Sequence, residues 1–160
     1  MLSRRQVLIL GTDATFVALA LGISSRAYSL DSPTLTHSDV EWRALLTPAQ
    51  YAALREDVTE QPYSSPLEHE KRAGLYACGG CQLPLFSSRT KYDSKTGWPS
   101  FWRPLDNAVR IRTDRSQGLL RTKVDCKRCA SHLGHVFGDG PPPTHLRYCL
   151  NGAGLIFTPT

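Results

Sequence analysis

Two Cys-x-x-Cys pairs constrain the fold of this chain more than any other feature of its sequence. The first pair is Cys78-Gly-Gly-Cys81 and the second is Cys126-Lys-Arg-Cys129, with 44 residues between them. Each pair holds two sulfur atoms on one tight turn, and two such turns facing each other form a tetrahedral cage of thiolates. This ligand set favours zinc over hard cations and leaves no coordination position open for catalysis. We therefore expect a structural zinc ion that ties together two distant parts of the chain.

Three other interpretations of the pairs stay open. Redox-active motifs of the thioredoxin type are one, although such a motif usually begins a helix in a βαβ unit and the sequence shows no such unit. Two structural disulfides in an oxidising compartment are another. Iron in place of zinc is the third, because spacing alone does not distinguish the two metals.

The first 29 residues have the composition of an export signal. Arg4 and Arg5 precede a mostly apolar stretch at residues 7–23, and Ala27-Tyr28-Ser29 offers small residues for cleavage after Ser29. The adjacent arginines resemble a twin-arginine signal, although Asp13 is unusual there. We predict export by machinery that recognises this signal, to a bacterial periplasm. A retained membrane anchor is the alternative, since the apolar stretch is just long enough to span a bilayer.

The rest of the chain is interpreted as a polar linker, residues 30–37, followed by one domain, residues 38–160. A capping box from Ser38 to Glu41 predicts a first helix, and Thr47-Pro48 predicts the start of a second that ends near Asp57. A third, very short helical turn is predicted at residues 65–68.

From Leu75 onward the segments become short and alternating, bounded by Gly, Pro, Asp and Asn, which is typical of an antiparallel β-domain. Val109, Ile111 and Thr113 alternate with arginines, which predicts a half-buried strand. The predicted strands cover residues 83–86, 108–113, 119–124, 133–137, 146–150 and 155–157. The fold class is therefore mainly β with a helical N-terminal flank.

The charge of the chain argues against a nucleic-acid partner. The formal net charge is +5, but without residues 1–29 only 16 Lys and Arg remain against 13 Asp and Glu, a net charge of +3. The sequence has no run of basic residues interleaved with aromatic ones, which nucleic-acid binding favours.

The fifth cysteine, Cys149, is the candidate for reactivity. A single cysteine in a strand is commonly a small buried apolar residue. Here, however, Arg147 and Asn151 share its strand face. Arg147 could lower the thiol pKa if its side chain lies near, and Asn151 could bind a substrate oxygen or a water molecule.

Two further segments could serve the same site. His132 and His135 are three residues apart, so a regular strand would direct them to opposite faces, but Gly134 could form a bulge that lets them converge. Residues 96–102, Thr-Gly-Trp-Pro-Ser-Phe-Trp, gather three aromatic rings that pack a core or line an apolar pocket.

Taken in order, the motifs CGGC, GWPSFW, CKRC, HLGHVFGDGP and RYCLNG resemble the B-type methionine-(R)-sulfoxide reductases. The resemblance covers roughly residues 38–158, and the combination of motifs is highly specific. It implies two small antiparallel sheets, in a tent-like or barrel-like arrangement, with short N-terminal helices and a Cys₄ zinc site. It also implies a catalytic domain that reduces the R epimer of methionine sulfoxide, chiefly in proteins.

The resemblance assigns roles to individual residues. Cys149 matches the nucleophile, and His132, His135 and Asn151 match the groups that handle the sulfoxide oxygen and water. Trp98 matches the ring that receives the methyl group of the substrate. In this chemistry a thiolate attacks the sulfoxide sulfur, a histidine donates a proton to its oxygen, and Cys149 becomes a sulfenic acid.

The resemblance also assigns supporting polar roles in substrate binding to Arg147 and Asp139, and it makes the four paired cysteines the zinc ligands. One departure matters. Many members of the family carry a resolving cysteine just before the GWPSF segment, where this chain has Thr96. We therefore expect a one-cysteine member whose sulfenic acid is reduced by an outside thiol, either a thioredoxin-like protein or a small thiol.

Three other functions are alternatives to methionine sulfoxide reduction in proteins. A zinc-dependent binding module would leave Cys149, the two histidines and Trp98 without a task. A nucleic-acid-binding zinc ribbon is opposed by the low charge and the export signal. A reductase of free methionine sulfoxide, or of another sulfoxide, is a closer alternative, because it would use the same chemistry.

Overall fold

The structure is a computed structural model that describes residues 32–115, 118 and 120–160. The predicted export signal and the first two residues of the predicted linker lie outside the described residues. Within them, no helix has the length and apolar character needed to cross a lipid bilayer.

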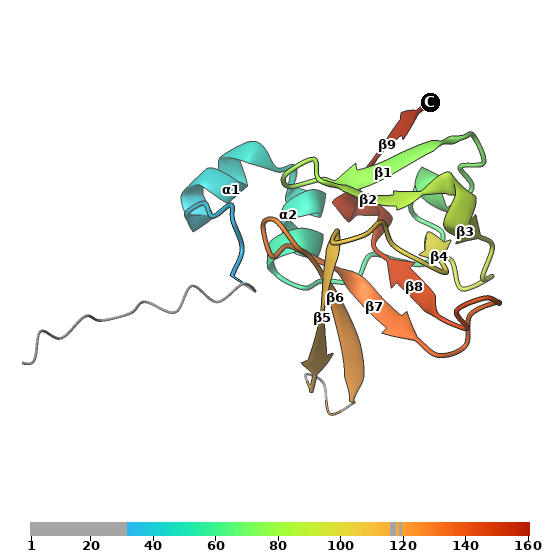
Figure 1. Cartoon of the computed structure of the whole chain (residues 1–160). Helices are drawn as coiled ribbons and strands as arrows, with labels where there is room; N and C mark the ends of the chain where they lie inside the picture. Colours follow the sequence, from blue (N-terminus) through green and yellow to red (C-terminus); the bar gives the residue numbers. More distant parts are fainter. Residues whose placement is uncertain (1–31, 116–117, 119) are drawn as a thin grey trace, which may run out of the picture.

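Two short helices open the described part of the chain (Figure 1). Helix α1 (Asp39–Leu45) begins at the predicted capping box, in which Ser38 and Glu41 bond each other's backbone N–H groups. Thr47 caps helix α2 (Pro48–Arg55) in the same reciprocal way. The short turn predicted after them is a single 3₁₀ turn, η1 (Pro66–Glu68). Capping thus satisfies backbone donors that a helix start would otherwise leave unpaired.

The strands form two antiparallel sheets, which confirms the predicted mainly β fold. The smaller sheet has the strand order β2-β1-β9, and the larger has the order β3-β4-β8-β7-β6-β5. The smaller one contains β1 (Gly74–Cys78), β2 (Pro84–Ser87) and β9 (Leu155–Pro159). The larger one contains β3 (Lys91–Tyr92), β4 (Ser100–Phe101), β5 (Val109–Asp114), β6 (Arg121–Cys126), β7 (His132–Phe137) and β8 (Arg147–Leu150). Two more 3₁₀ turns are η2 (Ser88–Thr90) and η4 (Gly152–Gly154).

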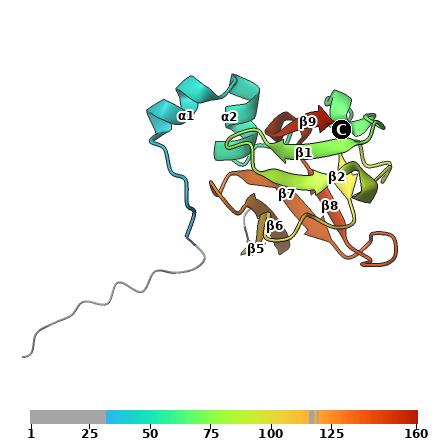
Figure 2. The ribbon, with the colours of Figure 1, turned by 45° about the horizontal axis from the view of Figure 1, so that its top comes forward.

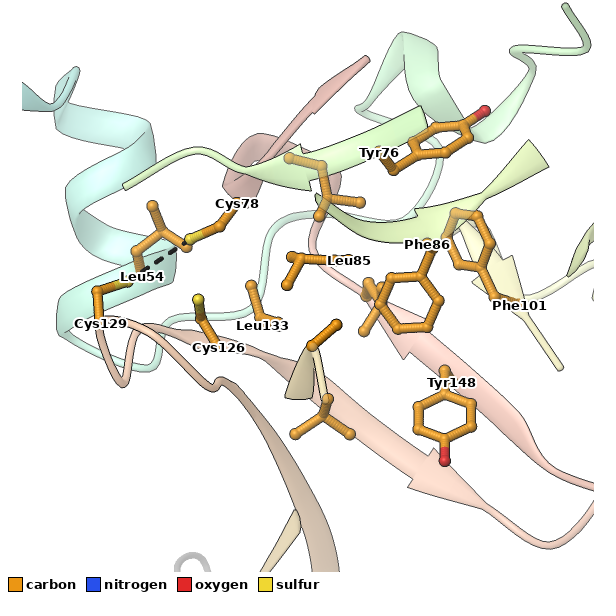
Figure 3. Close-up of a cluster of buried hydrophobic side chains, with 14 of the residues drawn as sticks. Leu54, Tyr76, Cys78, Leu85, Phe86, Phe101, Cys126, Cys129, Leu133 and Tyr148 are labelled. Atoms are coloured by element: carbon orange, nitrogen blue, oxygen red, sulfur yellow. Dashed lines mark hydrogen bonds between the residues drawn. The ribbon is translucent and has the colours of Figure 1, made fainter. Parts of the chain in front are cut away.

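The sheets face each other across a core of aromatic and aliphatic side chains (Figures 2 and 3). Phe86 and Phe101, one from each sheet, are fully buried with ring centroids 4.6 Å apart, and Tyr76 packs edge-on to Phe101 at 4.9 Å. Trp42 of α1 and Leu54 of α2 are also buried, so both helices dock on this core. Three buried cysteines of the paired motifs lie at one end of it.

Four features of the sheets differ from the prediction. The five-residue strand β1, central in the smaller sheet, is not among the predicted strands. Strands β3 and β4 have two residues each, too short to give a periodic signal. The strand predicted at 119–124 is observed at Arg121–Cys126; residue 119 lies outside the described residues, and Leu120 is 75% exposed. Ile111 is 45% exposed rather than buried, because β5 is an edge strand and its hairpin with β6 extends away from the smaller sheet (Figure 1).

The contact between β7 and β8 depends on a glycine. A Cβ atom added at Gly134 would overlap the carbonyl oxygen of Cys149 and lie 2.9 Å from the Cα atom of Leu150. Both obstacles are backbone atoms of a paired strand, so neither can yield without moving the sheet. The β7–β8 register therefore requires glycine at this position.

We expect Gly134→Ala to lower the free energy of unfolding by about 2 kcal/mol or more, the usual cost of overpacking a tightly packed site. Gly138→Ala is the matched control, because a Cβ atom there meets nothing within 4 Å. Urea unfolding of both variants measures the difference. Equal stability of the two variants would contradict the proposed close contact.

Candidate active site and metal centre

Cys149 lies in the middle of the larger sheet. Ser100 of β4 pairs with it on one side and His135 of β7 pairs with it on the other. Directly paired residues project to the same face of a sheet. The sequence separates these three residues by up to 49 positions, and the strand order brings their side chains together.

A bulge in β7 carries the histidines to neighbouring positions, as the glycine between them suggested. The pairing of β6 with β7 shifts between Val124 and Asp125, so Gly134 is opposite Val124 while His132 is opposite Asp125. Leu133 is the extra residue. Because one residue is inserted, His132 and His135 no longer follow strict alternation, and their ring centroids are 5.3 Å apart.

A small cavity of about 150 Å³ opens beside Cys149. It brings together four residues that the sequence analysis assigned to the active site. They are Trp98, His135, Cys149 and Asn151. Phe137, Thr59 and Arg121 complete much of its wall, which is therefore part aromatic and part polar.

The two histidines occupy different positions in this arrangement. His135 lines the cavity with Cys149, and its Nε2 atom lies 3.0 Å from Asp114 Oδ2, to which Arg121 also donates at 2.9 Å. His132 is only 2% exposed and lines a neighbouring cavity of about 250 Å³, which it shares with His135 and Asp114. His135 is therefore the imidazole beside the thiol, and His132 lies behind it.

Burial favours the neutral form of both the Cys149 thiol and the His135 imidazole, so it shifts their two pKa values in opposite directions. It raises the pKa of Cys149 above its ordinary value, although Thr96 and Arg147 act to lower it. Burial also lowers the pKa of His135, against the opposing effect of Asp114. Arg147 was expected to activate the thiol, and it does favour the thiolate, but desolvation outweighs it.

Arg147 and Asp139 form a fixed pair beside the site. The guanidinium donates two parallel hydrogen bonds to the carboxylate, at 2.9 Å from Nε and 2.8 Å from Nη2. The same guanidinium lies 4.4 Å from the centre of the Phe137 ring. The pair holds Arg147 in one orientation and lowers the pKa of Asp139.

Glu60 is a site residue that the sequence analysis missed. Its backbone N–H donates to Asn151 Oδ1 at 3.1 Å, and its carbonyl oxygen accepts from Trp98 Nε1 at 3.2 Å. Its carboxylate accepts from the backbone N–H groups of Gly152 at 2.6 Å and Ala153 at 2.8 Å. One loop residue thus fixes both the Asn151 amide and the Trp98 ring. A single glutamate in a loop, with no motif around it, gives no sequence signal for this role.

The four paired cysteines form a compact cluster apart from this cavity. Their sulfur atoms all lie within 4.8 Å of one another, and the nearest contacts join one pair to the other, Cys78 to Cys129 at 3.7 Å and Cys81 to Cys126 at 3.5 Å. A disulfide bond is about 2.05 Å long, so the sulfur atoms are unlinked. Bonds of about 2.3 Å from a central ion would set sulfur atoms about 3.8 Å apart in a tetrahedron. The cluster is therefore able to hold a metal ion.

The cluster joins the two sheets. Cys78 ends β1 of the smaller sheet and Cys126 ends β6 of the larger one. Neither pair begins a helix, unlike the thioredoxin-type motif that the sequence left open. The neighbouring sulfur atoms raise the pKa of Cys78 and Cys126 and lower that of Cys81 and Cys129, so a bound cation would displace the protons that the first two keep.

The architecture thus defines a two-sheet β-protein with a small cavity beside a single cysteine and a separate four-cysteine cluster able to hold a metal ion. Comparison with known proteins narrows this class. The sequence model of the SelR domain matches residues 46–159. The chain therefore belongs to the SelR-domain family of MsrB peptide methionine sulfoxide reductases, which confirms the family that the motifs indicated.

Several relatives carry the name peptide methionine sulfoxide reductase MsrB. The protein from Agrobacterium fabrum strain C58 is 49% identical over 131 residues, which are 81% of this chain and 97% of the relative. That from Pseudomonas putida strain W619 is 54% identical over 120 residues, 74% of this chain and 90% of the relative. That from Thiobacillus denitrificans is 52% identical over 132 residues, 82% of this chain and 98% of the relative.

We expect Cys126→Ser to lose the bound metal and several kcal/mol of unfolding free energy, because a metal held by folded ligands contributes its binding energy to folding. Cys149→Ser is the matched control and should keep both, since Cys149 is not part of the cluster. Elemental analysis gives the metal content per chain, and urea unfolding gives the stability. Full metal content and stability in Cys126→Ser would contradict a structural metal centre.

Proposed function

We propose that this chain reduces methionine (R)-sulfoxide in proteins back to methionine through a sulfenic acid on Cys149, which an external thiol then reduces. The observation that supports this most strongly is the shared cavity of Trp98, His135, Cys149 and Asn151. The cavity brings together the thiol of Cys149, the imidazole of His135, the amide of Asn151 and the ring of Trp98. Its volume is enough for the end of one substrate side chain.

In the first step the Cys149 sulfur attacks the sulfoxide sulfur as the S–O bond breaks. The oxygen passes to Cys149 as a sulfenic acid, and methionine leaves as the thioether. The sulfoxide gains two electrons and the cysteine sulfur loses them. A first outside thiol then displaces water to form a mixed disulfide, and a second one releases the Cys149 thiol.

The proton balance of the first step fits the charges of the site. Because burial raises the pKa of Cys149 and lowers that of His135, the pair holds its proton on sulfur at neutral pH. Attack requires that this proton end on the sulfoxide oxygen. His135 is paired directly with Cys149 and can pass it on, while Asp114 orients the ring.

The polar and apolar sides of the cavity determine how a sulfoxide is oriented in it. The Oδ1 atom of Asn151 accepts a bond from Glu60, which leaves the amide NH₂ group to donate to the sulfoxide oxygen or to water. The indole nitrogen of Trp98 is bonded to the Glu60 carbonyl, so the apolar ring is left to receive the methyl group. An oxygen held on one side and a methyl group on the other favour one epimer at sulfur.

We further propose that the four-cysteine cluster holds zinc, because four thiolates in a tetrahedral arrangement suit that ion. Cys78, Cys81, Cys126 and Cys129 would hold it, and its role would be to stabilise the fold. We also propose that residues 1–29 direct export to the periplasm, with cleavage near Ser29 or retention as an anchor. N-terminal sequencing of protein from fractionated cells tests this, and uncleaved protein confined to the cytoplasm would contradict it.

The proposed activity predicts turnover of the R epimer alone. We expect residues 30–160 to reduce a blocked methionine (R)-sulfoxide, with dithiothreitol as reductant, and to leave the S epimer unchanged. Cys149→Ser should abolish the reaction. Chromatography of the separated epimers measures both results. Absence of turnover by metal-loaded protein would favour a binding module, and turnover of both epimers would contradict the assigned selectivity.

The sequence contains one cysteine outside the cluster, which predicts the fate of the intermediate. One equivalent of substrate without reductant should leave a sulfenic acid on Cys149 that dimedone traps, and no intramolecular disulfide. Mass spectrometry of the peptide that contains Cys149 distinguishes the two products. A disulfide between Cys149 and another cysteine of the same chain would rule out the one-cysteine mechanism.

A further inference from the structure

Three hydroxyl groups beside Cys149 have no part in the mechanism described so far. Thr96 Oγ1 lies 3.9 Å from Cys149 Sγ and 2.8 Å from Ser94 Oγ. Ser94 Oγ lies 2.7 Å from Ser100 Oγ, and Ser100 Oγ donates to the carbonyl oxygen of Trp98 at 3.2 Å. Ser100 is fully buried and pairs directly with Cys149, so the chain of hydroxyl groups runs beside the thiol and its Ser100 end is excluded from water.

The carbonyl at the end of the chain decides the direction of every bond in it. A carbonyl only accepts, so Ser100 uses its one proton on Trp98. Ser94 must then donate to Ser100, and Thr96 must donate to Ser94. With all three hydroxyl protons used, only the Cys149 S–H remains to bond Thr96 Oγ1. The chain is therefore arranged to accept a proton-bearing thiol.

Ionisation of Cys149 removes that donor and leaves a charge beside Thr96. Each hydroxyl can rotate, and rotation of all three reverses the chain. Thr96 then donates to the sulfur, Ser94 to Thr96, and Ser100 to Ser94. The bond to the Trp98 carbonyl is exchanged for a bond to an anion, and hydrogen bonds to charged groups are the stronger kind.

We propose that Thr96 is a catalytic residue that donates a hydrogen bond to the Cys149 thiolate, and that Ser94 and Ser100 are the positioning residues that supply it. The inference rests on the proposed function in one respect, namely that Cys149 is the nucleophile. It adds a hydroxyl group 3.9 Å from the reacting sulfur that does not line the cavity with His135.

The loop that carries Thr96 is held in place by its own contacts. The carbonyl oxygen of Gly97 accepts from the backbone N–H of Tyr63 at 2.7 Å, and Asp93 Oδ1 accepts from the Lys95 N–H at 2.8 Å. A Cβ atom at Gly97 would lie 2.7 Å from Pro62, so the loop approaches that segment closely. The Thr96 hydroxyl is thus presented from a fixed backbone.

Other groups also act on the Cys149 thiol. Burial raises its pKa, and Thr96 is the strongest of the groups that lower it, ahead of Arg147 and of Ser100, which also acts on the sulfur directly. The titratable or charged groups that face Cys149 from the packed elements are Arg147 on its own strand, His135 on β7, Tyr92 on β3 and Asp139 beyond Arg147. All of them are retained when only Thr96 is changed.

The test compares Thr96→Val, which has the same shape without the hydroxyl, with Thr96→Ser, which keeps the hydroxyl. The rate at which iodoacetamide alkylates Cys149 is measured from pH 6 to pH 10 on metal-loaded protein, with the modified peptide identified by mass spectrometry. At pH 7 we expect Thr96→Val to react about tenfold more slowly, since one bond to a charged group is lost. Thr96→Ser should stay within about twofold of the unchanged chain.

Ser94→Ala provides a second variant that leaves Thr96 in place, and we expect it to slow alkylation by a smaller factor in the same direction. Unfolding midpoints and metal content establish that each variant is folded. Superimposable pH profiles for Thr96→Val and the unchanged chain would overturn the inference. Alkylation does not require sulfoxide turnover. A chain that alkylates as expected but reduces no sulfoxide would therefore overturn the proposed function and leave the hydroxyl chain intact.

Discussion

The convergence of four cysteine sulfur atoms is the constraint on which the rest of the structure depends. The two sheets share a core of aromatic side chains, but apolar contact alone is not directional and leaves their relative position weakly specified. A metal ion held by the cluster would fix that position, because Cys78 ends a strand of one sheet and Cys126 ends a strand of the other. Two sheets with several very short strands would thereby be held in one arrangement.

The effect of the cluster extends directly to the active site. Arg55 of α2 lies 3.4 Å from the Cys129 carbonyl oxygen and 4.8 Å from the Trp42 ring, so both helices are tied to the second cysteine turn. That turn leads into β7, which begins at His132. The bulge at Leu133 brings the two histidines together, and the pairing of β7 with β8 sets His135 beside Cys149. The four-cysteine cluster and the Cys149 thiol are therefore separate sites connected by one short stretch of strand.

Much of this architecture could be predicted, because its signals are local in the sequence. The capping boxes at Ser38 and Thr47 and the cysteine turns are short motifs, and the bulge next to Gly134 follows from the spacing of the two histidines. Strands β3 and β4 could not be predicted, since two residues show no periodicity. The exposure of Ile111 depends on which strand lies at the edge, and alternation does not reveal that. Glu60 bonds Asn151 and Trp98 through its backbone, which no side-chain pattern encodes.

The small size of the cavity beside Cys149 has a consequence for which damaged proteins can be repaired. About 150 Å³ is well below the size of a usual ligand pocket, and it accommodates the tip of one side chain rather than a folded surface. Under the proposed function, an oxidised methionine must therefore protrude from its own protein by nearly its full length. Selection among targets then lies in the target itself. Residues in loose or partly unfolded segments are restored first, and those inside intact cores wait until their own protein opens.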